Sequence, residues 1–363
     1  MKIFNFLRAT LLIASLSMGA YNQAYAAEPD QAVQNGDFAW KTDRQIWLAP
    51  QGLMPAPLTS NVDFMEMFVP DAPWKEAASH TQVFSLYGAF LGHATQDQVN
   101  TVVADLNRRG IAIAVEVGVI NVPNKPTPPC GGLGIVEGYG TVALAQRISQ
   151  MIKNAGGEIK YIAMDEPFYY GHYYTKAPNR GYGCHSFVSE IIKLSAPTLN
   201  EFIKEFPRVI IGDIEPTVVV EQSPAWKDDL LEWVVGLRAV IGRPLAFMQL
   251  DIEWKQANGV EDALAFYHDA EALRAQDLLR KTGIIYDGLP PPTADAAWVE
   301  DAQDHVLLME GKYKLRPDQA IFQSWMPNPT HAMPDSAHDT LTSLVVFYFS
   351  PMVEAITGRG YTR

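Results

Sequence analysis

The chain has 363 residues, of which 48% are hydrophobic and 11% aromatic, and its formal net charge is −13. This composition is typical of a globular protein with a large core and excludes a mainly disordered chain. The acidic balance disfavours nucleic acid and anionic membrane surfaces as partners, so neutral or weakly charged partners such as sugars suit the chain better.

The N-terminus has the pattern of a secretory signal peptide. Lys2 and Arg8 flank a short apolar start, an apolar stretch covers 11–20, and the sequence AYA at 24–26 supplies a cleavage site. We expect removal of residues 1–26, which takes away two basic and no acidic residues and leaves a charge of −15. The mature chain is then secreted or periplasmic and free of the membrane, although a retained N-terminal anchor is the alternative.

Eight apolar runs follow in chain order, and helix-like segments lie between most of them. The runs are at 45–50, 82–90, 111–120, 160–166, 208–215, 245–253, 283–288 and 320–325. The helix-like segments are at 96–110, 141–157, 188–206, 228–242, 261–277 and 296–311, and several end in a glycine such as Gly110, Gly156 or Gly242. The near-continuous hydrophobicity of the runs is typical of parallel strands that are covered on both faces.

This alternation predicts one (β/α)₈ TIM barrel over residues 27–363, with no break that marks a second domain. An open, doubly wound sheet is the rival architecture. No GxGxxG or GxxxxGK[ST] motif follows the first run, and eight strands close a barrel naturally.

The strand ends are unusually acidic. Because the site of such a barrel lies at the carboxyl ends of its strands, we expect these acids to meet there, although any one of them alone could be a solvated loop carboxylate or a helix cap. Residues two apart on a strand point to the same side, so either pair, 213/215 or 251/253, could face the barrel mouth, and Gln249 shares the parity of the second pair. The acids are Glu116, Asp165, Glu166, Asp213, Glu215, Asp251, Glu253 and Asp287.

Aromatic residues gather at the same strand ends. Tyr169 belongs to an aromatic cluster after the fourth run, Trp254 follows the sixth, and Trp325 ends the eighth. Sugar rings have apolar C–H faces that pack on aromatic planes, while their hydroxyl groups bind carboxylates. Carboxylates interleaved with tyrosine and tryptophan therefore predict a carbohydrate cleft with Trp325 as its main platform, although rings of this kind also pack loops onto a barrel rim.

At this point the sequence resembles the barrel-type glycoside hydrolases. In their large retaining clan a glutamate ends the fourth strand, commonly within Asn-Glu-Pro, as the general acid/base, and a carboxylate ends the seventh as the nucleophile. This chain has Asp165-Glu166-Pro167 at the fourth run and Tyr286-Asp287-Gly288 at the seventh. The resemblance implies hydrolysis of a glycosidic bond in a polysaccharide or glycan, with Glu166 as acid/base and Asp287 as nucleophile.

Two departures from that clan leave the mechanism open. Asp165 stands where asparagine is usual, and Asp287 stands where glutamate is usual. The Asp-Glu pair also resembles substrate-assisted hexosaminidases, in which the aspartate orients a 2-acetamido group that acts as the nucleophile. Glu253 and Glu215 compete with Asp287 for the nucleophile role.

Two other classes of function stay open. One is an exported barrel that binds carbohydrate without turnover. The other is a metal-dependent lyase, isomerase or hydrolase, because carboxylates with histidine hold divalent cations in some barrels. HxH and HExxH motifs are absent and the eight histidines are scattered, so we expect neither a metal nor another cofactor.

The two cysteines yield a first testable prediction. Cys130 and Cys184 both lie in loops rich in glycine and proline, and an exported chain with two cysteines favours one disulfide. Alkylation of the unreduced, exported protein followed by mass measurement should find no modified cysteine. Two alkylated thiols would contradict the bond.

Overall fold

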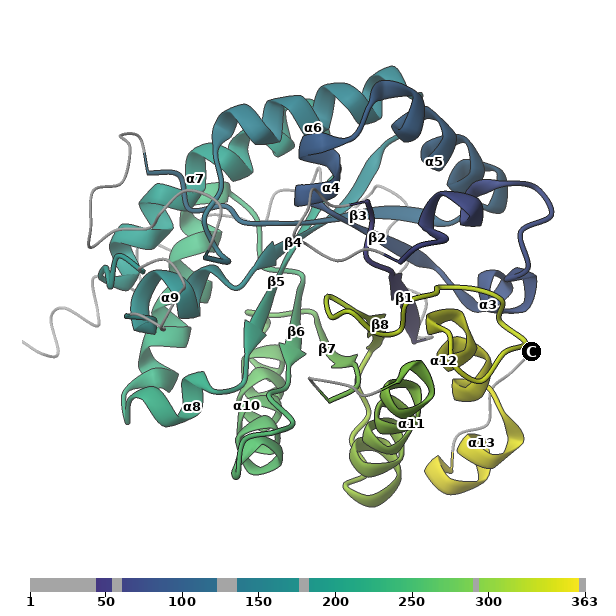
Figure 1. Cartoon of the computed structure of the whole chain (residues 1–363). Coiled ribbons are helices and arrows are strands. Elements are labelled where there is room, and N and C mark those ends of the chain that lie inside the picture. The colour runs from purple at the N-terminus through teal and green to yellow at the C-terminus, as the bar shows by residue number, and fades with distance from the viewer. Residues whose placement is uncertain (1–43, 54–60, 123–135, 176–182, 290–293, 359–363) are drawn as a thin grey trace, which may run out of the picture. The chain divides into compact units, whose positions relative to one another are not determined.

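The computed structural model describes residues 44–53, 61–122, 136–175, 183–289 and 294–358, which lie in one compact unit that begins at Arg44. Eight parallel strands pair in chain order, and β8 pairs with β1 to close a barrel (Figure 1). The strands are β1 (Gln45–Ala49), β2 (Val83–Tyr87), β3 (Ala112–Val117), β4 (Ile159–Asp165), β5 (Ile210–Pro216), β6 (Phe247–Asp251), β7 (Lys281–Tyr286) and β8 (Gln319–Gln323). The predicted TIM barrel is therefore confirmed, with every strand inside or within two residues of its predicted run.

Helices surround the strands (Figure 1). All six predicted helical segments form helices. The longer helices are α5 (Gln96–Arg109), α6 (Val142–Asn154), α7 (Val188–Glu205), α9 (Trp226–Ile241), α10 (Gly259–Ala275) and α11 (Asp295–Val306). The shorter ones are η1 (Phe64–Phe68), α3 (Lys75–His80), α4 (Gly88–His93), η2 (Tyr169–Tyr173), α8 (Val219–Gln222), η3 (Leu307–Lys312), α12 (Leu341–Tyr348) and α13 (Pro351–Thr357).

Local sequence sets the ends of α5. Thr95 caps its first turn by accepting a hydrogen bond from Gln98 N, and the Gln98 side chain completes a capping box. The helix ends at Gly110, whose φ of 70° lies in the left-handed region that glycine adopts without steric cost. The predicted end of this helix is thus confirmed.

The second apolar run changes from strand to helix within its length. The run at 82–90 ends as a strand at Tyr87, because Gly88 begins α4. A Cβ atom at Gly88 would lie 2.8 Å from Val117 Cγ2, so the missing side chain lets α4 pack closely on the end of β3. Continuous hydrophobicity did not mark this change from strand to helix, since both elements are buried.

Successive strand residues face two different environments. One set, such as Leu48, Val115 and Ile284, packs against the helices in the main apolar core. The other set faces the barrel interior, where Trp47, Tyr161 and Phe247 pack with ring centroids 5.0 to 6.2 Å apart. The interior is therefore a packed core, and the space for a site is at the end of the barrel where the strands have their carboxyl ends.

A glycine on β5 fixes which set faces inward on that strand. A Cβ atom at Gly212 would lie 2.3 Å from the ring of Phe247, so only glycine fits beside that ring. Ile210 and Ile214 share the inward parity of Gly212, and Asp213 and Glu215 therefore face the helices.

Some sequence-based expectations lie outside the described residues. The signal peptide at 1–26 and the mature segment 27–43 are among them, so cleavage and export stay predictions. Within the part of the chain that the structure describes, no helix is long and apolar enough to cross a membrane.

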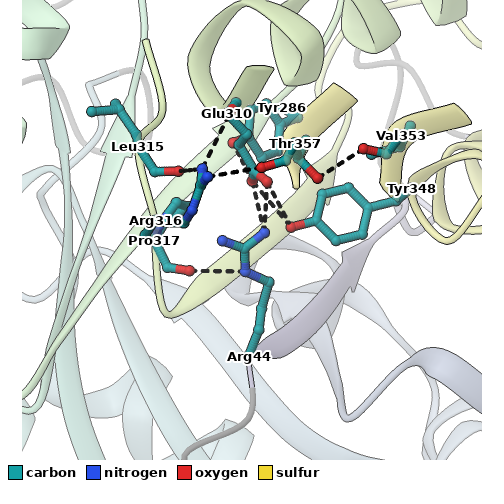
Figure 2. Close-up of polar contacts among 9 residues, drawn as sticks. All are labelled: Arg44, Tyr286, Glu310, Leu315, Arg316, Pro317, Tyr348, Val353 and Thr357. Atoms are coloured by element: carbon teal, nitrogen blue, oxygen red, sulfur yellow. Dashed lines mark hydrogen bonds and ion pairs between the residues drawn. The ribbon is translucent and has the colours of Figure 1, made fainter. Parts of the chain in front are cut away.

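A buried ion pair joins the start of β1 to the last helices (Figure 2). Arg44 donates to both oxygens of Glu310 at 2.9 and 2.7 Å, and Glu310 also accepts from the hydroxyl groups of Tyr286 and Tyr348. Arg316 donates to the Glu310 carbonyl and to Thr357 O, which ties α13 to η3. The Glu310 side chain is fully buried, so these donors replace the water that it loses.

We predict that this pair matters for stability. Glu310→Gln keeps the shape but leaves the Arg44 guanidinium without its anion, and it should lower the free energy of unfolding by about 3 kcal/mol. Tyr348→Phe, the control, removes one hydroxyl donor and should cost about 1 kcal/mol. Urea unfolding measures both, and equal losses would contradict a special role for the ion pair.

Candidate active site

Carboxyl groups meet at the barrel mouth from four different strands. Each lies within one residue of the carboxyl end of its strand, where a (β/α)₈ barrel carries its site. We call this group the mouth cluster: Glu116 in β3, Asp165 at the end of β4 and Glu166 after it, Asp251 at the end of β6 and Asp287 after β7. Burial raises the pKa values of the four members other than Asp251, and the charge of Asp251 raises each of these four further, which places them near Asp251.

Glu166 is the most unusual member in its backbone. Its φ of 54° lies in the left-handed region, which is uncommon for a residue with a side chain. Adjacent residues of a strand point to opposite faces, but this turn lets Glu166 reach the same mouth as Asp165. The residue is 7% exposed, and its carboxyl group is hydrogen-bonded to Asp251.

The Glu166–Asp251 pair shares a proton. Burial, the charges of Asp251, Glu137 and Asp165, and the hydrogen bond to Asp251 raise the pKa of Glu166 well above its ordinary value. Burial also raises the pKa of Asp251, to about 7, while the hydrogen bond from Glu166 opposes this rise. A hydrogen bond between two carboxyl groups requires a proton on one of them, so the pair holds at least one proton.

Asp165 belongs to the same charged environment. Burial and the charges of Glu137 and Asp251 raise its pKa to about 8. At neutral pH the mouth cluster therefore holds more protons than the same residues would hold in water.

Glu116 has a different partner, on a strand that is not a neighbour of β3 in the barrel. Gln323 of β8 donates its side-chain amide to both Glu116 oxygens at 3.0 Å. Burial and the charges of Asp165 and Asp251 nevertheless raise the pKa of Glu116. Deeper in the barrel Gln249 donates to Gln319 at 2.9 Å, so the predicted inward parity of Gln249 is confirmed.

Asp287 is held together with two rings. Trp254 Nε1 donates to Asp287 Oδ1 at 2.7 Å, and the indole stacks on His305 of α11 with ring centroids 3.7 Å apart and 6° between the planes. His305 Nδ1 donates to the Asp287 carbonyl at 2.7 Å. Burial raises the pKa of Asp287 and the indole N–H opposes the rise, whereas burial lowers the pKa of His305 and favours its neutral form.

Three side chains lie around the mouth cluster. Glu137, on the loop after β3, and Glu253, after β6, are exposed, and their charges raise the pKa of Asp251. The half-buried ring of Tyr169 is close enough to Glu166 and Glu253 that burial and these charges raise its pKa to about 12.

Two expected site residues lie elsewhere. Asp213 and Glu215 were expected to be able to face the mouth, but both are fully buried on the outer side of β5. Asp213 accepts a hydrogen bond from Trp233 Nε1 of α9 at 2.6 Å, and Glu215 accepts from the backbone N–H groups at the start of η2. The reason is the inward placement of Gly212, which assigns the opposite parity to the two acids.

Two further expectations stay predictions. Trp325 follows β8 and is half-buried, and its carbonyl oxygen accepts a hydrogen bond from Gln51 Nε2 at 3.2 Å. Its use as a sugar platform is not tested by these contacts. Cys130 lies outside the described residues, so its bond to Cys184 also remains a prediction.

Sequence reasoning missed four residues of the site. Gln323 had a usable signal, because it is a polar residue within the eighth apolar run, two residues before Trp325. Tyr87, at the end of β2, lies near Glu116, because burial and the charge of Glu116 raise its pKa, and its hydroxyl donates to Ser324 O at 3.1 Å. Glu137 and His305 come from a loop and a helix, and only the folded chain brings them to the mouth.

Metal-binding geometry is not evident in these residues. Within the described ranges, no group of three or more histidine, cysteine, aspartate or glutamate side chains is placed to hold a metal ion.

Comparison with known proteins gives a limited result. No protein-family model matches the sequence, and no curated protein matches it. Similar solved structures include a psychrophilic glycoside hydrolase family 10 endo-β-1,4-xylanase, with 9% identity, coverage of 83% of this chain and 91% of that chain, and a TM-score of 0.46. A xylanase of Paenibacillus barcinonensis has 12% identity, coverage of 78% and 85%, and a TM-score of 0.45. The catalytic domain of a Pyrococcus furiosus chitinase has 13% identity, coverage of 88% and 98%, and a TM-score of 0.43. Because these TM-scores are below 0.5, we assign the fold from the strand pairing of this chain and consider its chemistry from its own residues.

We predict that the mouth cluster makes stability depend on pH. The folded-state pKa of Asp165 is about 8, above its ordinary value, so its contribution to stability is complete below about pH 4 and is lost as the pH rises to about 8. Asp165→Asn abolishes this titration. The variant should therefore gain about 1 to 3 kcal/mol of unfolding free energy relative to wild type between pH 4 and pH 8.

Denaturant unfolding at several pH values measures this gain. Asp71→Asn is the control, because Asp71 is exposed and outside the mouth. A difference between Asp165→Asn and wild type that stays constant with pH would contradict the prediction.

Proposed function

We propose that the protein is a glycoside hydrolase in which Glu166 is the general acid/base. The observation that supports this most strongly is the Glu166–Asp251 pair, because cleavage of a glycosidic bond needs a carboxyl group that stays protonated near neutral pH. Such a proton is uncommon on a glutamate in water and is maintained here by burial and neighbouring charge.

The second carboxyl group of the proposed reaction is Asp287. It follows a different strand from Glu166. Burial and the charge of Asp251 raise its pKa, and the N–H donor from Trp254 opposes this rise and so favours the ionised form that a nucleophile needs. Glu166 would donate its proton to the leaving glycosidic oxygen, and Asp287 would attack or stabilise the anomeric carbon. Glu253 stays an alternative for this role, since it lies on the exposed rim beside Asp287.

Asp165 would orient the substrate and adjust Glu166. Its charge raises the pKa of Glu166, which keeps the acid protonated. For a substrate with a 2-acetamido group, Asp165 would instead orient that group as the internal nucleophile, and Asp287 would then only bind substrate.

Aromatic residues support a saccharide as the substrate. Trp254 lies flat on His305, Tyr169 stands beside Glu166, and Trp325 follows β8. Flat rings next to carboxylates match the apolar faces and hydroxyl groups of sugars. We further propose that the protein acts outside the cytoplasm, secreted or periplasmic, on the basis of its N-terminal signal pattern.

The test is the effect of Glu166→Gln on substrates with different leaving groups. On an unactivated polysaccharide the variant should lose about 10²-fold or more in rate, because glutamine cannot protonate the leaving oxygen. On aryl glycosides with acidic leaving groups, which need little protonation, the loss should be much smaller.

Reducing-end and chromogenic assays measure the two rates. Glu76→Gln is the control, because it makes the same chemical change at an exposed position on α3. Equal losses on both substrate classes would reassign Glu166. Binding without turnover would favour a sugar-binding barrel, and loss of wild-type activity in EDTA would favour a metal-dependent enzyme.

A further inference from the structure

We propose that Glu215 is a positioning residue for Glu166: its carboxylate, on the outer side of β5, holds the turn that directs Glu166 into the barrel mouth. The inference rests on the proposed role of Glu166 as the acid. From its position in the sequence, Glu215 was expected to contact substrate or to act as the nucleophile. The role proposed here is a different one.

The turn at Glu166 needs to be held. A left-handed backbone conformation is strained for a residue other than glycine and persists only where its surroundings fix it. The Glu166 N–H donates to Met164 O at 3.2 Å and to Ile214 O at 3.1 Å, and its carbonyl accepts from Tyr170 N at 3.1 Å. These bonds tie the turn to β5 and to η2.

Glu215 supplies the strongest of these restraints. One carboxylate oxygen accepts from Phe168 N at 2.8 Å and the other from Tyr169 N at 2.9 Å. The first N–H groups of a helix have no acceptor within it, so the two Glu215 oxygens satisfy two donors that the helix itself leaves without a partner. Because Glu215 is fully buried, water cannot replace it at these two amides.

The opposite side of the turn is closed by backbone. A Cβ atom at Gly138 would lie 3.1 Å from both the Glu166 carbonyl oxygen and Pro167 Cα, so the loop after β3 packs tightly on the turn. The turn is therefore clamped between this loop and Glu215. Loss of the two hydrogen bonds to Glu215 would allow the backbone of residue 166 to leave its left-handed conformation. The carboxyl group of Glu166 would then move away from Asp251.

Asp213 provides a matched control. It lies on the same strand, on the same outer side, and is equally buried. Its hydrogen bond from Trp233 Nε1 joins β5 to α9 and does not involve the turn. Both Asp213→Asn and Glu215→Gln remove a buried carboxyl group. Only Glu215→Gln also removes the hydrogen bonds that hold the turn at Glu166.

The test follows the titration of Glu166 by ¹³C NMR of labelled glutamate carboxyl groups. The Glu166 signal is assigned by its loss in Glu166→Gln. We expect Glu215→Gln to lower the Glu166 midpoint by about one pH unit or more, because a displaced carboxyl group is better solvated and farther from Asp251. Asp213→Asn should leave the midpoint unchanged. An unchanged midpoint in Glu215→Gln, or an equal shift in Asp213→Asn, would overturn the proposal.

A second variant covers the case in which Glu215→Gln does not fold. Glu215→Asp keeps the carboxyl group but is shorter by one methylene group and cannot reach both amides. Hydrogen–deuterium exchange in peptides that cover 166–173 should be faster than in wild type for Glu215→Asp and not for Asp213→Asn. Wild-type exchange in Glu215→Asp would overturn the proposal.

Activity separates this inference from the proposed function. In a glycosidase, Glu215→Gln should lower kcat with KM little changed and should move the alkaline limb of the pH profile to lower pH. If Glu166 titrates as expected in all variants but the protein cleaves no glycoside, the proposed function fails and the positioning role stands. If cleavage depends on Glu166 but kcat and the profile are unchanged in Glu215→Gln, the positioning role fails.

Discussion

Burial of several carboxyl groups at one end of the barrel is the constraint on which the rest of the site depends. Five acids at the ends of β3, β4, β6 and β7 cannot all be ionised in a confined mouth, because desolvation and mutual repulsion both penalise the charged forms. The cluster responds by retaining protons at neutral pH. This response supplies the acid that the proposed reaction needs, and it also lowers stability as the pH rises, which is the common conflict between stability and function at such sites.

The remainder of the barrel keeps these acids in place. The barrel interior next to the mouth is filled by Trp47, Tyr161 and Phe247. Their rings leave no space there for the carboxyl groups, which stay at the mouth. On the outer side, Glu215 restrains the turn after β4. The Arg44–Glu310 pair joins the beginning of the barrel to its end at a distance in sequence of 266 residues. Rigid support of this kind is what a site of fixed geometry requires.

Much of the fold could be predicted from the sequence, and less of the site. Eight apolar runs separated by helical patterns specify the barrel, because strands buried on both faces are apolar throughout. Because such strands are apolar on both faces, their sequence does not indicate which residues point into the barrel. On β6 the polar Gln249 marked the inward parity, and Asp251 was placed correctly at the mouth. On β5 the inward residues are Ile210, Gly212 and Ile214, which are as apolar as outward ones, so Asp213 and Glu215 had no visible orientation.

Residues that reach the mouth from loops and helices had no local signal. His305 joins the site through its stacking on Trp254, and Glu137 through a loop that packs on the turn at Glu166, and both contacts exist only in the folded chain. The choice between Asp287 and Glu253 as the second carboxyl group likewise depends on contacts, of which the Trp254 N–H to Asp287 is one.

The most direct test of the central claim, that Asp251 keeps the proton on Glu166, is the pH dependence of kcat/KM for Asp251→Asn and wild type on an unactivated saccharide. The acid must be protonated to act, and the charge of Asp251 raises the pKa of Glu166, so wild type should remain active at pH 7 and lose activity on the alkaline side. Removal of that charge should move the alkaline midpoint of Asp251→Asn to lower pH. An unchanged midpoint, or a move to higher pH, would contradict the account.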